Sequence, residues 1–77
     1  MQFGLPTKRS VTIAGHETSV SLEPIFWAAA EAAAAELGLP LNALIARIDV
    51  ERIDGVGAGP NLTSALRQWL MARAVRQ

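Results

Sequence analysis

The N-terminal part of the chain alternates between polar and apolar residues in two short runs. The runs are residues 10–14 and 18–22, and the Gly15-His16-Glu17 segment between them favours a turn. The apolar positions fall on one face of each run: Val11, Ile13, Val20 and Leu22. A period of two predicts two half-buried β-strands. The alternation leaves two arrangements open, a hairpin within one chain or pairing of each strand with a second copy.

A helix is predicted directly after the second strand, over residues 24–37. Pro24 suits the first helical turn, where its missing amide costs no hydrogen bond, and Gly38 suits the left-handed residue that ends a helix. The alanine-rich run between them has high helix propensity. Residues at helical spacing mark the expected buried face: Phe26, Ala30, Ala33 and Leu37. Because alanine leaves a thin core, we expect Phe26 and Trp27 to supply much of its volume.

Two further helices are predicted, over residues 41–51 and 61–75. Apolar residues recur with the helical period in both: Leu41, Leu44, Ile45 and Ile48 in the first, then Leu62, Ala65, Leu66, Trp69 and Leu70 in the second. Asn61 can cap the last helix by accepting a hydrogen bond from its first turn. The glycine-rich stretch 55–60 is interpreted as a linker, because no Gly-Lys-Ser/Thr follows to make a phosphate loop.

These elements predict one α+β, mostly helical domain at residues 10–77, preceded by a flexible basic arm at residues 1–9. A chain of 77 residues is marginal as a monomer, and this one has no cysteine to form disulfides. Its residues are 51% hydrophobic and only 18% charged. One strand and two helices, residues 18–48, cannot close a core alone.

We therefore predict an intertwined homodimer. In this arrangement a twin chain covers the apolar side of the strand, whose edges otherwise have no partner. The predicted dimer core consists of Val20, Leu22, Phe26, Trp27, Leu44, Ile45 and Ile48.

The net charge is zero, but the charges are distributed unevenly. All seven acidic residues lie between positions 17 and 54, whereas both ends of the chain are basic. One interpretation is ordinary solvated surface charge. The other is that the N-terminal arm contacts nucleic-acid phosphates through Lys8 and Arg9. No apolar run reaches the length of a membrane span and no signal-peptide pattern is present, so a cytoplasmic protein is expected.

Side chains suited to catalysis are sparse, since the chain has no cysteine, no tyrosine and one histidine. His16 lies close in sequence to Ser19, but neighbouring strand residues alternate faces, which disfavours a nucleophile–histidine–acid arrangement. One histidine alone does not make a zinc site. We predict neither an enzyme nor a bound metal or cofactor, and we interpret His16 as a turn residue.

The order and spacing of the elements over residues 18–48 resemble the ribbon-helix-helix family of DNA-binding proteins. The matching features are the Ser19-Val20-Ser21-Leu22 strand, the Glu23-Pro24 helix entry, the Gly38 turn and Leu44-Ile45. The whole chain is similar to a bacterial, uncharacterised subgroup of that family. The resemblance implies an intertwined homodimer with an intermolecular antiparallel β-ribbon, a two-stranded sheet to which each chain gives one strand.

The resemblance also implies how such a dimer contacts DNA. Base-reading strand residues map to Glu17, Ser19 and Ser21. Phosphate-binding backbone amides at the start of the second helix map to Leu41 and Asn42, and helix N-termini suit phosphate physically.

Two functions remain open from the sequence. The first is a homodimeric transcriptional regulator that places a β-ribbon in the major groove of double-stranded DNA. The second is a protein-interaction module, such as an antitoxin or an assembly adaptor, that keeps the dimer but binds another protein through the linker or the last helix. The outward serines and the basic arm favour the first. The zero net charge and the additional C-terminal helix favour the second. Glu17 stands where many members of the family carry a basic residue, and a carboxylate facing DNA repels phosphate.

Overall fold

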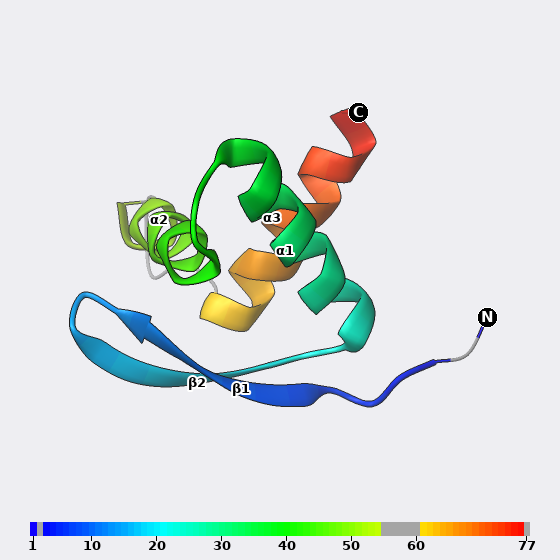
Figure 1. Ribbon diagram of the computed structural model, residues 1–77, viewed down its shortest axis with the longest axis horizontal. Coiled ribbons are helices and arrows are strands. Elements are labelled where there is room, and N and C mark those ends of the chain that lie inside the picture. Colours follow the sequence, from blue (N-terminus) through cyan, green and yellow to red (C-terminus); the bar gives the residue numbers. More distant parts are fainter. Residues whose placement is uncertain (2, 55–60, 77) are drawn as a thin grey trace.

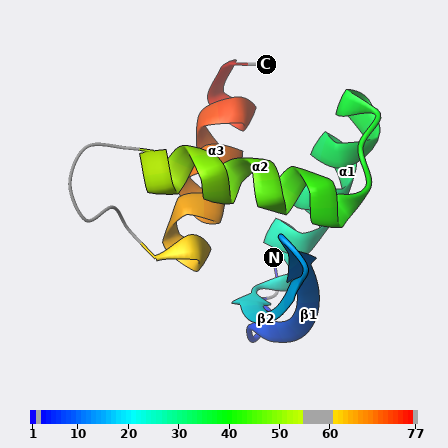
Figure 2. The same ribbon diagram turned by 90° about the vertical axis from the view of Figure 1, so that its left-hand side faces the viewer.

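The fold is a two-stranded antiparallel hairpin packed beneath three helices (Figures 1 and 2). It is seen in a computed structural model that describes residues 1, 3–54 and 61–76. The elements in chain order are β1 (Thr7–Ile13), β2 (His16–Leu22), α1 (Pro24–Leu37), α2 (Leu41–Asp54) and α3 (Leu62–Arg76). The predicted α+β class and the order of elements, with an additional C-terminal helix, are confirmed.

The two strands pair within one chain through a tight turn at Ala14-Gly15. Both residues have positive φ, 51° for Ala14 and 81° for Gly15, as a two-residue type I′ turn requires. The predicted turn at Gly15-His16-Glu17 is therefore placed too late. Because Ala14 adopts the left-handed conformation, His16 and Glu17 begin β2 instead, with His16 opposite Ile13.

Strand β1 begins at Thr7, within the segment predicted as a flexible arm. Thr7 pairs with Leu22, Lys8 with Ser21 and Arg9 with Val20. The side chains of residues 7–10 show no apolar alternation, so it is backbone pairing with β2 that extends the strand. The prediction of a flexible basic arm over residues 1–9 is therefore wrong for residues 7–9, which belong to β1.

Helix α1 is bounded as the sequence predicts. Pro24 occupies its first turn, and Gly38 ends it with φ 68° while donating its amide to the carbonyls of Ala34 and Ala35. Its buried face differs from the predicted one, because Leu37 is 40% exposed and Phe26 is only half-buried. The larger Trp27 side chain takes the core position, and the stripe that accompanies it is Ala30, Ala33 and Ala34.

Trp27 is confirmed as a core residue, with 2% of its surface exposed. Its indole N–H donates a hydrogen bond of 2.8 Å to the backbone carbonyl of Thr7. This bond satisfies the polar atom of a buried ring and ties the first residue of β1 to α1.

A single chain covers its own apolar interior. Val20 and Leu22 are 1% and 0% exposed, and α3 packs Leu66 and Leu70 into the same core. The prediction that a twin chain must cover Val20 and Leu22 is therefore wrong, because it considered residues 18–48 and left out β1 and α3. The other residues predicted for a dimer core are buried in the same interior, apart from the half-buried Phe26: Trp27, Leu44, Ile45 and Ile48.

Helix α2 continues beyond its predicted end to Asp54, whereas α3 lies within one residue of its predicted bounds. The Asn61 side chain accepts a 2.8 Å hydrogen bond from the Ser64 amide, which confirms the predicted cap. The linker predicted at 55–60 lies outside the described residues. Within the described segments no single helix has the length and apolar character to cross a membrane; α1 and α2 meet that test only together, as a pair bent by 96°.

Candidate nucleic-acid interface

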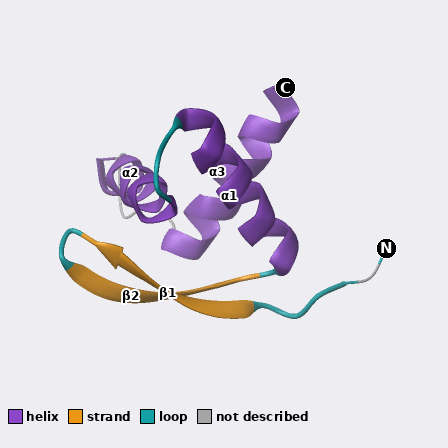
Figure 3. Cartoon of the chain, in the orientation of Figure 1, coloured by secondary structure: helices purple, strands orange, loops and turns teal. Residues whose placement is uncertain are grey.

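The antiparallel register sorts the hairpin side chains into two faces, because directly opposed residues share a face. The face that carries Val20 and Leu22 packs against the helices, which lie on one side of the sheet (Figure 3). The opposite face, called here the outer face, carries six polar residues: Lys8, Ser10, Thr12, Glu17, Ser19 and Ser21. All are exposed except Ser21, which is half-buried.

The three residues predicted to read bases lie together on this outer face. Strand β1 adds two hydroxyl groups that the sequence analysis missed, with Ser10 opposite Ser19 and Thr12 opposite Glu17. A signal was present, since Ser10 and Thr12 alternate with the buried Val11. Only the strand register, however, shows that they share a face with the β2 residues.

Lys8 and Arg9, predicted together as phosphate contacts, point to opposite sides of the sheet. Lys8 lies on the outer face opposite Ser21. Arg9 lies on the inner side, where its guanidinium is 2.8 Å from the Glu31 carboxylate and 4.6 Å from the centre of the Trp27 ring. Through these contacts Arg9 links β1 to α1. Lys8 is therefore the cation that lies beside the predicted base-reading residues.

Two arginines of α3 also pair with glutamate carboxylates of the same chain. The Arg67 guanidinium donates to both carboxylate oxygens of Glu23, at 3.0 and 3.1 Å, and Arg73 contacts Glu36 at 2.6 Å. The basic ends of the sequence therefore fold back onto acidic residues in its middle. This pairing accounts for much of the uneven charge distribution without any nucleic acid.

The pKa of Glu23, the residue before α1, is shifted in the folded chain. A hydrogen bond with its own backbone and hydrogen bonds from Arg67 lower the pKa of the Glu23 carboxyl below its ordinary value, although desolvation opposes them. The carboxylate form is therefore favoured in the folded chain.

The predicted phosphate anchor at the start of α2 belongs to the helical layer and not to the outer face. Leu41 is half-buried and Asn42 is exposed, and the Leu44 amide donates to the Pro40 carbonyl at 3.1 Å. Backbone amides in the first turn of a helix have no acceptor within the helix, so those of Leu41 and Asn42 suit an anion.

No metal centre is evident in the described part of the chain. His16 is exposed at the start of β2, and no group of three or more His, Cys, Asp or Glu side chains is positioned to hold an ion.

A polar-faced hairpin followed by packed helices defines a class of small α+β domain built on a ribbon. The chain belongs to the ribbon-helix-helix domain family, whose model matches residues 6–74. Members of this family are generally DNA-binding regulators or antitoxins, their fold is not an enzymatic one, and their domains typically form dimers. Neither the curated proteins nor the solved structures give a significant match.

Proposed function

We propose that the protein binds double-stranded DNA as a homodimer and acts as a cytoplasmic transcriptional regulator, with the outer face of the hairpin against the major groove. The observation that carries this proposal is the outer face itself, which is wholly polar in a chain that is 51% hydrophobic. Serine and threonine hydroxyls donate to or accept from base edges, and Lys8 supplies a charge for phosphate. Membership of the family supports the same role.

In the proposed dimer, the β2 strands of two chains pair with each other. Within the described residues the sheet has two strands, so β2 has one edge without a strand partner. Unpaired N–H and C=O groups along such an edge are a template for another strand. Antiparallel pairing across a two-fold axis then makes a four-stranded sheet. Its central β2–β2 ribbon, which carries Ser19 and Ser21, faces the groove, and Lys8 lies toward the margins of the sheet, where phosphates lie.

Because each chain closes its own core, this dimer does not have to complete a hydrophobic interior. We therefore expect association to depend on protein concentration and to be strengthened by DNA, through mass action. Sedimentation equilibrium with and without duplex DNA checks this. A monomer that binds DNA one chain at a time would contradict the dimer and leave DNA binding intact.

DNA binding is tested by fluorescence anisotropy with labelled duplex DNA over a series of salt concentrations. The logarithm of the association constant should fall linearly with the logarithm of salt concentration, by roughly 0.9 per phosphate neutralised. Lys8→Glu should weaken binding, whereas Arg76→Glu makes the same change of charge away from the outer face and should not. Absence of binding at low salt, or equal effects of the two variants, would refute the proposed interface.

A further inference from the structure

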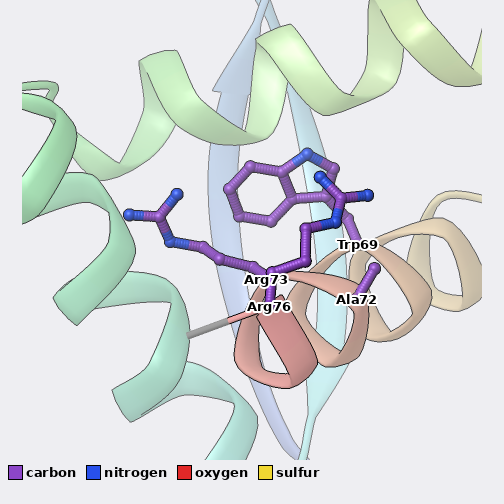
Figure 4. A pocket seen from close by; sticks show the side chains of 4 residues that line it. All are labelled: Trp69, Ala72, Arg73 and Arg76. Atoms are coloured by element: carbon purple, nitrogen blue, oxygen red, sulfur yellow. The ribbon is translucent and has the colours of Figure 1, made fainter.

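The surface of the helical layer has a groove that is separate from the outer face. Two adjoining hollows, of about 170 and 240 Å³, share Trp69 and Arg73 in their walls. The first is completed by Ala72 and Arg76. The second is completed by Leu37, Leu44, Arg47, Ile48 and Glu51. The two hollows together are called here the Trp69 groove, and Figure 4 shows its indole between the side chains of Arg73 and Arg76.

The groove combines a half-buried aromatic ring with an excess of positive charge. Arg73 lies 5.7 Å from the centre of the Trp69 ring and pairs with Glu36. Arg47 and Arg76 are exposed, and neither forms an ion pair with another described residue. The helix dipole favours a cation such as Arg76 in the last turn of α3. Arg47 lies in the interior of α2, where the dipole gives no such stabilisation.

The walls of the hollows indicate what they hold. Their combined volume is within the ~300–1,000 Å³ typical of small-molecule pockets, so volume does not select the occupant. An aliphatic wall in one hollow and a cationic wall in the other suit two different side chains of one chain segment. Leu44 and Ile48 give the second hollow an aliphatic wall, whereas Arg76 presents hydrogen-bond donors suited to a carboxylate in the first.

We propose that the Trp69 groove binds a segment of another protein that carries an aliphatic and an acidic side chain. The aliphatic side chain enters the hollow walled by Leu44 and Ile48, and the acidic side chain pairs with Arg76. A nucleic-acid strand fits less well, because the carboxylate of Glu51 in the groove repels a continuous row of phosphates. This binding goes beyond DNA recognition and does not depend on it, since the groove and the outer face share no residue.

The test is a selection from a displayed library of random short peptides, using the full chain as bait and counter-selecting against the Arg76→Glu variant. The selected peptides should share acidic and aliphatic residues. Anisotropy with a labelled selected peptide should then show at least about tenfold weaker binding to Arg76→Glu, the scale of a lost charge pair. The matched control, Lys8→Glu, should bind the peptide as the unmodified chain does.

Several outcomes would overturn this inference. They are the absence of any enriched motif, a basic motif, equal weakening by Arg76→Glu and Lys8→Glu, and displacement of the peptide by a single-stranded oligonucleotide. Circular dichroism establishes that each variant is folded. DNA binding of the unmodified chain is measured in parallel. If the unmodified chain binds the peptide but not DNA, the function proposed for the outer face is refuted and the groove is not.

Discussion

On the inner face of the β1–β2 hairpin, Val20 and Leu22 are buried beneath the helices and Arg9 is held by Glu31 and the Trp27 ring. On the outer face the side chains are hydroxyls, one carboxylate and Lys8. The inner face therefore contributes to stability, and the outer face is available for a partner. Lys8 and Arg9 are adjacent cations, yet the strand places one on each face and so gives them different surroundings.

The difference shows that a basic residue near a chain end is not by itself a sign of phosphate contact. Arg9, Arg67 and Arg73 each meet both a carboxylate and an aromatic ring of the same chain. Lys8, on the face without a core, has no such contact within the described residues. If the comparison is correct, substitutions on the two faces should separate folding stability from DNA binding.

The largest effect is expected for Leu66→Ala, which removes most of a buried α3 side chain from the core above the inner face. Leu66 is 0% exposed, and leucine-to-alanine substitutions in a core typically cost about 2–5 kcal/mol of unfolding free energy. Met71 on the same helix is 59% exposed, so Met71→Ala should change stability by no more than about 0.5 kcal/mol. Urea denaturation measures both. Equal stabilities would mean that α3 does not complete the core.

Glu17→Arg should strengthen DNA binding, because it replaces an exposed carboxylate on the outer face with a cation. We expect about a tenfold gain at low salt, which corresponds to roughly 1.4 kcal/mol, and a steeper salt dependence. Asp54→Arg makes the same change of charge at the exposed end of α2 and is the control. Anisotropy titrations that show the same gain for both variants would attribute it to overall charge and not to the outer face.

Replacing the adjacent cations one at a time tests the sorting of side chains directly. Lys8→Ala should reduce the salt slope of DNA binding by roughly 0.9 for each subunit, with stability unchanged. Arg9→Ala should leave that slope unchanged and cost up to about 1 kcal/mol of stability, the upper range for an exposed ion pair. Paired DNA titrations and thermal melts distinguish the two. An equal loss of DNA binding in both variants would show that Lys8 and Arg9 do not have different roles on the two faces of β1.

The smallest effect concerns the pH dependence of stability through Glu23. Its folded-state pKa is lowered, so its stabilising contribution is present above the ordinary glutamate pKa and is lost as the pH falls through the folded value. Glu23→Gln should therefore flatten the acid side of the stability profile and leave the change near neutral pH small. Denaturation midpoints measured from neutral to acidic pH check this, with Glu51→Gln as the control. The same profile for the Glu23 variant and the unmodified chain would exclude the Arg67 pair as a contributor.

Part of the candidate interface was predictable from the strand alternation alone. Ser19 and Ser21 alternate with buried apolar residues, so their outward direction follows from the period of two. The contribution of Ser10 and Thr12 depends on the register with β2, and the inward role of Arg9 depends on Glu31 lying across from it on α1. These contacts join residues 5 to 22 positions apart in the sequence, and the period of two within one strand does not show which residues of another element they meet.

By itself the sequence determined the local boundaries of the helices. Pro24 begins α1, Gly38 ends it and Asn61 caps α3, because each acts through atoms within a few residues of itself. Only the tertiary structure decided that the hairpin closes within one chain, that Trp27 and not Phe26 occupies the core, and that α3 packs against β2. These outcomes depend on which apolar faces meet, and a periodic pattern shows that a face is apolar without showing what packs against it.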